Sequence, residues 1–182
     1  VGMVASAYTT MDLRSKIRVI ADFPKPGVSY KDITTLLKDG AALRYVVDRM
    51  AEYYADKPVD VIVGVESRGF LLGAPLAYKM GTGFVLVRKP GKLPADTESV
   101  SYELEYGCDS LEIHKDAIEP GQRVLLVDDL LATGGTMAAA ADLVTKLKGE
   151  ITGFAFLVEL AYLNGREKLG DYDIFTLVTY ED

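Results

Sequence analysis

Residues 124–136 read Val-Leu-Leu-Val-Asp-Asp-Leu-Leu-Ala-Thr-Gly-Gly-Thr, and this stretch decides the fold. The run from Arg123 to Val127 is typical of a buried strand in a parallel sheet. We expect this strand to deliver two adjacent carboxylates to its carboxyl end, where a loop of small residues opens a helix from about Thr136 to Leu147. Glycines let a ligand approach the backbone closely, and the amides at a helix start attract phosphate. The pattern therefore predicts a phosphate-binding turn beyond a parallel strand.

The same alternation of strand, polar loop and helix continues on both sides of this stretch. A helix is predicted from Phe70 to Met80, and further strands at Val59–Val65, Gly83–Val87, Ile151–Val158 and Ile174–Thr179. This order predicts an α/β fold, in which helices cover both faces of a mainly parallel sheet. Its ligand crevice should lie beyond the carboxyl ends of the strands.

Other segments depart from that alternation. The spacing of Leu13, Ile17 and Ile20 predicts a helix, which ends at the turn Asp22–Gly27, and a second helix is expected between Gly40 and Asp56.

A hairpin is predicted from two strands, Ser99–Tyr106 and Ser110–His114, which are joined around Gly107.

The composition fits one folded domain and excludes several classes of site. Of the 182 residues, 49% are hydrophobic and 26% are charged, and the net charge of −7 disfavours binding to nucleic acid or anionic lipid. The single cysteine and single histidine exclude an internal disulfide, a Cys-rich zinc site and a two-His metal site. No apolar run approaches the ~20 residues of a membrane span. Because Val1 to Tyr8 lack the features of a secretory signal, we expect a cytoplasmic protein.

The two acids of the turn need a partner other than phosphate. Asp128 and Asp129 would repel a phosphate, so they suit the hydroxyls of an attached sugar or a bridging metal ion. Together with the phosphate turn they indicate a ribose 5-phosphate. The competing interpretation is an ordinary parallel sheet that ends a strand with Asp and Gly. Neither Gly-x-x-x-x-Gly-Lys-Ser/Thr nor Gly-x-Gly-x-x-Gly after a strand occurs in the chain.

The stretch of residues 124–136 resembles the phosphoribosyl pyrophosphate signature of the type I phosphoribosyltransferases. The likeness runs from about Asp22 to Val178, and further blocks point to the adenine-using members of that family. These blocks are Asp22–Gly27, Ser67–Phe70, Arg88–Pro94 and Tyr102–Gly107. The resemblance implies the type I phosphoribosyltransferase fold: a twisted, mainly parallel sheet flanked by helices in a single domain of residues 1–182. It also implies a small N-terminal hood of about residues 1–35 and a mobile hairpin lid of about residues 93–113.

The resemblance implies a reaction as well. The 5-phosphoribosyl group of phosphoribosyl pyrophosphate would pass to adenine, giving AMP and pyrophosphate, with Mg²⁺ as cofactor. A cytoplasmic homodimer without nucleic-acid or membrane partners is implied. Two alternatives remain open: a phosphoribosyltransferase for another purine, and a phosphoribosyl-pyrophosphate-sensing regulator that binds nucleic acid, although the chain lacks a basic appended domain.

The family's site residues carry over onto matching positions of this sequence. The ribose 5-phosphate would lie against Asp128, Asp129, Ala132, Thr133, Gly134, Gly135 and Thr136. Pyrophosphate would contact Ser67, Arg68, Arg88, Lys89 and Lys92. Adenine would be held by Ser29, Tyr30, Lys31 and Leu160, and the catalytic pair would be Glu105 and Tyr106.

Some of these assignments have a plainer competing interpretation. Lys92 could belong to a solvated basic turn, Glu105 to an exposed strand, and Leu160 to the sheet core. This chain has Ser29, Tyr30 and Lys31 where the family commonly has an apolar residue, Phe and Arg respectively, so Ser29 offers adenine less apolar wall. Mg²⁺ would be held through pyrophosphate and ribose hydroxyls near the two aspartates. An unusual peptide geometry, strained or cis, is implied before Ser67 or Arg68.

Overall fold

The computed structural model describes residues 10–103 and 107–182. The chain divides into two compact units, Val1–Val46 and Val47–Asp182, and the boundary falls within one helix, α2 (Gly40–Tyr53). The two units are described in turn.

The first unit contains a two-stranded antiparallel sheet. A short 3₁₀ helix, η1 (Arg14–Lys16), precedes β1 (Arg18–Ala21), which pairs with β2 (Ser29–Asp32), and α1 (Thr34–Leu37) follows. The helix predicted at Leu13–Ile20 is therefore wrong.

The turn between the two strands explains this outcome. Asp22 accepts a hydrogen bond from the Gly27 amide at 2.8 Å, and Gly27 has φ +85°, a conformation that favours glycine. The peptide between Phe23 and Pro24 is cis. This turn brings Ile20 opposite Tyr30, so strand pairing replaces the helix that the local spacing predicted.

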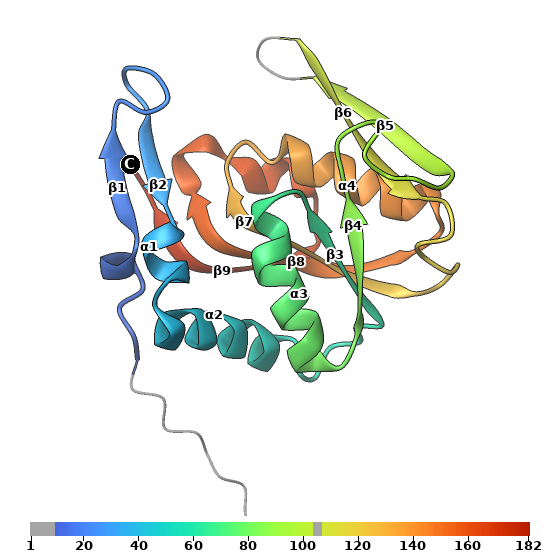
Figure 1. Ribbon diagram of the computed structural model, residues 1–182, viewed down its shortest axis with the longest axis horizontal. Helices are drawn as coiled ribbons and strands as arrows, with labels where there is room; N and C mark the ends of the chain where they lie inside the picture. The colour runs from blue at the N-terminus through green and yellow to red at the C-terminus, as the bar shows by residue number, and fades with distance from the viewer. Residues whose placement is uncertain (1–9, 104–106) are drawn as a thin grey trace, which may run out of the picture. The chain divides into compact units, whose positions relative to one another are not determined.

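The second unit is built on a five-stranded sheet, and Figure 1 shows the strands side by side. Its order is β4-β3-β7-β8-β9, and every pair is parallel. The strands are β3 (Val61–Val65), β4 (Gly83–Val87), β7 (Arg123–Leu131), β8 (Glu150–Leu160) and β9 (Asp173–Tyr180). These ranges confirm the five predicted strands.

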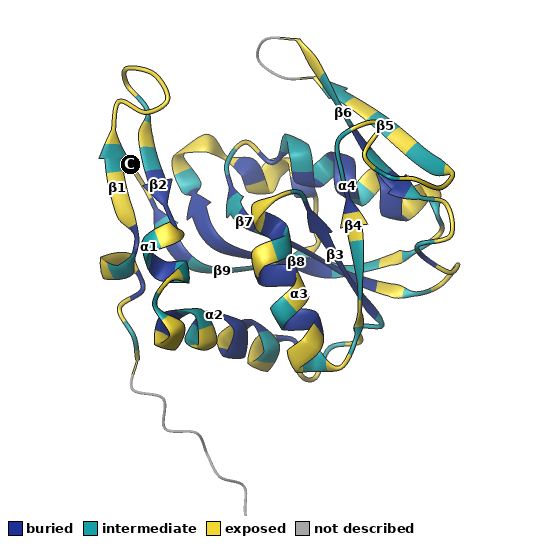
Figure 2. Cartoon of the chain, viewed as in Figure 1, coloured by how far each residue is buried: buried dark blue, intermediate teal, exposed yellow. Residues whose placement is uncertain are grey.

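Helices cover both faces of the sheet, because its strands carry apolar side chains on both faces. One set, which includes Val124, Leu126 and Phe154, packs with α4 (Gly135–Lys146) in one apolar cluster. Successive side chains of a strand point to opposite faces, and α3 (Arg68–Met80) packs on β3 and β7. Both helices were predicted. Figure 2 shows the resulting buried centre, with β3 and most of β7 and β8 in dark blue.

The predicted hairpin is also present. It consists of β5 (Thr97–Glu103) and β6 (Cys108–His114), and its base is part of the core, since Leu111 and Ile113 are fully buried. The apolar cluster under α4 includes both residues. The hairpin is thus anchored on the α4 face of the sheet.

Two short 3₁₀ helices, η2 (Ala161–Leu163) and η3 (Gly165–Leu169), connect β8 to β9. Among the described residues, no helix is long and apolar enough to span a membrane.

Candidate active site

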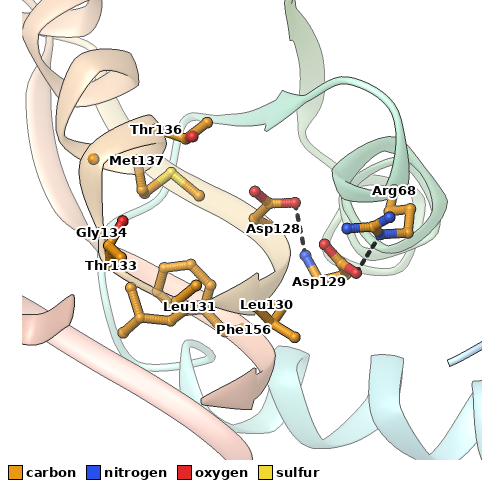
Figure 3. A pocket seen from close by; sticks show the side chains of 12 residues that line it. Arg68, Asp128, Asp129, Leu130, Leu131, Thr133, Gly134, Thr136, Met137 and Phe156 are labelled. Carbon is orange, nitrogen blue, oxygen red and sulfur yellow. Dashed lines mark hydrogen bonds and ion pairs between the residues drawn. The ribbon is translucent and has the colours of Figure 1, made fainter. Parts of the chain in front are cut away.

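A cavity of about 180 Å³ lies beyond the carboxyl end of β7. Figure 3 shows Arg68 and the two aspartates on one side of it, and the turn at Thr133 and Gly134 on the other. It is lined by Arg68, Asp128, Asp129, Leu130, Leu131, Ala132, Thr133, Gly134, Gly135, Thr136, Met137 and Phe156. All seven residues predicted to contact ribose 5-phosphate therefore line one cavity.

The two aspartates are held by the strand itself. β7 continues past Val127, the predicted strand end, because Asp128 to Leu131 remain paired with β8. Both acids therefore lie on a paired strand and not on the loop that follows it. A paired backbone restricts where their carboxyl groups can point.

The two carboxyl groups have different surroundings. Asp129 is 4% exposed and accepts a hydrogen bond from Nε of Arg68 at 2.6 Å, whereas Asp128 accepts one from the Asp129 amide at 2.8 Å. Burial, together with the neighbouring charge of Asp129, raises the pKa of Asp128 well above its usual value. The raised pKa favours the neutral form of Asp128, and Arg68 offsets the charge of Asp129. The pair is thus compatible with an anionic sugar ligand.

Glycine is required where α3 and the turn approach their neighbours. A Cβ on Gly69 would lie 3.1 Å from Oδ1 of Asp128, and one on Gly134 would lie 2.4 Å from the carbonyl oxygen of Gly165. Gly134 also has φ +81°, and α4 begins at the next residue. The turn therefore rests on η3, and the free amides at the start of α4 are held at the cavity edge.

Three of the predicted cationic residues gather around one carboxylate. Glu66, at the end of β3, accepts hydrogen bonds from Nζ of Lys92 at 2.9 Å, from Nη2 of Arg88 at 3.4 Å, and from the backbone amide of Lys89. The peptide between Glu66 and Ser67 is cis, which is one of the two geometries that the resemblance implied. Burial alone would raise the pKa of Glu66, but these hydrogen bonds outweigh it and lower the pKa below the usual value.

The side chain of Tyr102 connects the hairpin to the cavity and, through Asp109, to the basic turn that contains Lys89. The hydroxyl of Tyr102 on β5 lies 3.3 Å from Oγ1 of Thr136 and 3.3 Å from Oδ2 of Asp109. Asp109 in turn pairs with the ammonium group of Lys89. Residues predicted for the two ends of the substrate are therefore linked through β5 and β6.

The residues predicted to hold adenine lie on two elements, β2 and β8. Ser29, Tyr30 and Lys31 are neighbours on β2 in the first unit, and Nζ of Lys31 donates to the Ser29 hydroxyl at 2.8 Å. Leu160 ends β8 in the second unit and is 9% exposed. Glu105 and Tyr106 lie outside the described residues.

Sequence reasoning missed several residues of the site. Phe156 and Met137 line the cavity from β8 and α4, and Gly165 supports the turn. Glu66 and Asp109 hold the cationic side chains. An acid directly before Ser67-Arg68-Gly69 was a signal for Glu66, and Met137 directly follows Thr136. Phe156, Gly165 and Asp109 come from elements distant in sequence.

The donors at the cavity fit a metal ion that is shared with substrate. Among residues 10–103 and 107–182, no three His, Cys, Asp or Glu side chains gather as a metal site. Asp128 and Asp129 are the carboxyl groups that line the cavity. Mg²⁺ is typically bound by one or two carboxylates together with substrate phosphates and water. The residues therefore suit a Mg²⁺ ion that takes most of its ligands from the substrate.

Comparisons with known proteins point to one family. The family described as "Phosphoribosyl transferase domain" matches residues 30–181. The adenine phosphoribosyltransferase of Clostridium perfringens (strain SM101 / Type A) is 61% identical over 171 residues, which are 94% of this chain and 99% of that protein.

Solved structures give the same result. The adenine phosphoribosyltransferase of Thermoanaerobacter pseudethanolicus has a TM-score of 0.90 and 56% identity, covering 92% of this chain and 97% of its own. The enzyme of Saccharomyces cerevisiae, complexed with adenine and an imino-altritol bisphosphate, has a TM-score of 0.86 and 40% identity, covering 91% of this chain and 96% of its own.

Proposed function

The chain belongs to the phosphoribosyl transferase domain family, and from this membership and the cavity at β7 we infer its reaction. It is a pentosyltransferase that moves the 5-phosphoribosyl group of phosphoribosyl pyrophosphate to adenine, giving AMP and pyrophosphate. The observation that carries this conclusion is the meeting of an acid pair and a glycine turn at one strand end.

We propose that the cavity takes the ribose 5-phosphate. The amides at the start of α4, with the hydroxyls of Thr133 and Thr136, would donate to the phosphate oxygens. Asp128 and Asp129 would accept from the ribose hydroxyls. Because the acids lie on a strand and the amides on a helix end, both sets of contacts are in place before the substrate arrives.

Departure of pyrophosphate needs positive charge at the other end of the substrate. Positive charge develops on the ribose as the bond to pyrophosphate breaks, and cations stabilise the negative charge on the leaving group. We propose that Ser67, Arg68, Arg88, Lys89 and Lys92 supply these contacts, as the resemblance implied. Each of the four cations has a carboxylate partner, namely Asp129, Glu66 or Asp109, from which it can turn to a phosphate oxygen.

The residues proposed for adenine binding and for proton transfer at adenine are those predicted from the sequence. Adenine would be read by Ser29, Tyr30, Lys31 and Leu160, and Glu105 with Tyr106 would assist loss of the adenine proton. A bound Mg²⁺ ion would neutralise charge on the pyrophosphate. The homodimer, the cytoplasmic location and the mobile lid stay predictions.

The reaction is tested by mixing the protein with Mg²⁺, phosphoribosyl pyrophosphate and one free purine at a time. We expect AMP and pyrophosphate with adenine, at a rate at least 100-fold above that with guanine, hypoxanthine or xanthine. Equal rates with another purine would contradict the adenine assignment. Failure with every base would contradict the enzyme itself and favour the regulator.

A further inference from the structure

We propose that Glu66 is a positioning residue for the leaving pyrophosphate. It holds the basic turn of residues 88–92 in one place before the substrate binds, and this role rests on the proposed function of Arg88 and Lys92.

The first argument is the position of the carboxylate. Glu66 follows β3 directly, and its side chain is only 9% exposed, although it belongs to a residue type that is rarely buried without a partner. Its amide donates to the carbonyl oxygen of Val87 at 3.0 Å, so its backbone is tied to the end of β4. The backbone of Glu66, and with it the origin of its side chain, is therefore fixed at the ends of two parallel strands.

The second argument is what the carboxylate touches. Oε1 of Glu66 accepts from the amide of Lys89, and Oε2 accepts from Nζ of Lys92 and from Nη2 of Arg88. The side chains of Arg88 and Lys92 are 32% and 48% exposed. One buried acid thus contacts a backbone donor and two cationic side chains of a turn that water can reach.

The third argument is electrostatic. Arg88, Lys89 and Lys92 fall within five consecutive residues and carry like charges, which repel one another when no anion is present. Glu66 provides the compensating charge for two of them, and Asp109 provides it for Lys89. The turn is thereby held together in the absence of substrate.

Arg88 keeps hydrogen-bonding capacity in this arrangement. Its Nη2 contact with Glu66 is long, at 3.4 Å, and among the described residues its buried Nε has no hydrogen-bond partner. A guanidinium has five donors in a fixed fork that suits phosphate oxygens. Glu66 therefore places Arg88 without using up its donors.

The substitution Glu66→Gln tests the proposal. The amide oxygen of Gln can still accept from Lys89, but the charge that holds Arg88 and Lys92 is lost. We expect the KM for phosphoribosyl pyrophosphate and the inhibition constant of pyrophosphate to rise about tenfold, while the KM for adenine and kcat change less than threefold. The matched control is Glu98→Gln, because Glu98 on β5 pairs with Lys146 of α4 at 3.8 Å and not with a cation of the turn. This control should leave all four constants unchanged.

Three outcomes would overturn the proposal. An unchanged KM for phosphoribosyl pyrophosphate in Glu66→Gln shows that the acid does not position the turn. A lower KM shows that the carboxylate competes with pyrophosphate. Equal rises in both KM values show a general structural defect. If the wild-type protein forms no AMP, the proposed function fails and not the positioning role.

A second comparison tests whether Glu66 acts through Lys92. In a Lys92→Met background, Glu66→Gln should raise the KM for phosphoribosyl pyrophosphate by less than it does in the wild type, because the two residues act as a pair. The full tenfold effect in both backgrounds would contradict the proposal. If Glu66→Gln does not fold, Glu66→Asp replaces it, since Asp keeps the charge but draws it one methylene away from Lys92. A rise in KM of at least threefold is then expected, and no rise would contradict the proposal.

Discussion

Gly134 gives the sharpest test of how the phosphate turn is held. Its φ of +81° favours glycine, and a Cβ added there would lie 2.4 Å from the carbonyl oxygen of Gly165. Gly134→Ala therefore adds two costs, one from the backbone conformation and one from the contact with η3.

The two costs can be separated with a matched variant. Gly81, at the end of α3, has φ +70° and nothing within 4 Å of an added Cβ, so Gly81→Ala carries the backbone cost alone. A left-handed conformation costs an Ala about 1–2 kcal/mol, and an overpacked contact costs about 1–3 kcal/mol more. We expect Gly81→Ala to lower the free energy of unfolding by about 1–2 kcal/mol and Gly134→Ala by about 2–5 kcal/mol.

The turn can also relieve the contact by moving. A displacement of ~1 Å of groups that position a substrate can lower turnover about 100-fold. Urea denaturation and steady-state kinetics with phosphoribosyl pyrophosphate therefore have to be measured on both variants. We expect Gly134→Ala to lose stability beyond Gly81→Ala, or kcat/KM, or both. If Gly134→Ala matches Gly81→Ala in stability and stays within threefold of wild-type kcat/KM, the contact with Gly165 does not hold the turn.

Three further predictions concern other contacts. Arg68→Gln removes the guanidinium partner of the buried Asp129, so kcat/KM for phosphoribosyl pyrophosphate should fall at least tenfold. Because Arg68 is half-exposed, the free energy of unfolding measured by denaturant titration should fall by only about 1 kcal/mol. Wild-type kinetics in this variant would contradict the assignment of Arg68 to pyrophosphate. Hydrogen bonds from Thr34, with help from Arg18, lower the pKa of Asp32 to about 2, so its contribution to stability is present above about pH 4 and is lost as the pH falls toward 2. Replacement of Asp32 by Asn should therefore cost about 1 kcal/mol at pH 7 and much less near pH 2, and an equal cost at both pH values would refute this reasoning. Tyr102→Phe removes the hydroxyl that joins the hairpin to the first turn of α4, which should lower the free energy of unfolding by about 0.5–1.5 kcal/mol, and an unchanged melting temperature would show that this contact contributes nothing.

The sheet and its flanking helices could be predicted because their signals are local. The apolar runs at β3, β4 and β7 are bounded by turn residues, and the alternation of strand and helix leaves few arrangements. The first unit was harder. The apolar residues at 13, 17 and 20 have helical spacing, yet Ile17, Val19 and Ile20 are β-branched, which favours strands. Pairing with β2 then decided the outcome.

The gathering of residues 128–136 at one cavity could be predicted because all these groups come from consecutive residues. The supports of the site could not. Gly165 meets the turn from a segment about 30 residues later, and Asp109 meets Lys89 only after β5 and β6 have paired. Such contacts depend on tertiary packing, for which one sequence gives no local signal. The pairing of Arg68 with Asp129 and that of Lys92 with Glu66 depend on the same packing.

The placement of Asp128 and Asp129 inside a paired strand has a practical consequence for altering this enzyme. Their positions follow from the register of β7 against β8, so a substitution nearby disturbs the sheet as well as the proposed contacts with the sugar. Libraries that aim to redirect the chain toward another nucleobase should leave this strand untouched. Randomising Ser29 to Lys31, the residues proposed to hold the base, changes β2, which among the described residues pairs with β1 and with no strand of the five-stranded sheet, so the register of β7 against β8 does not depend on it.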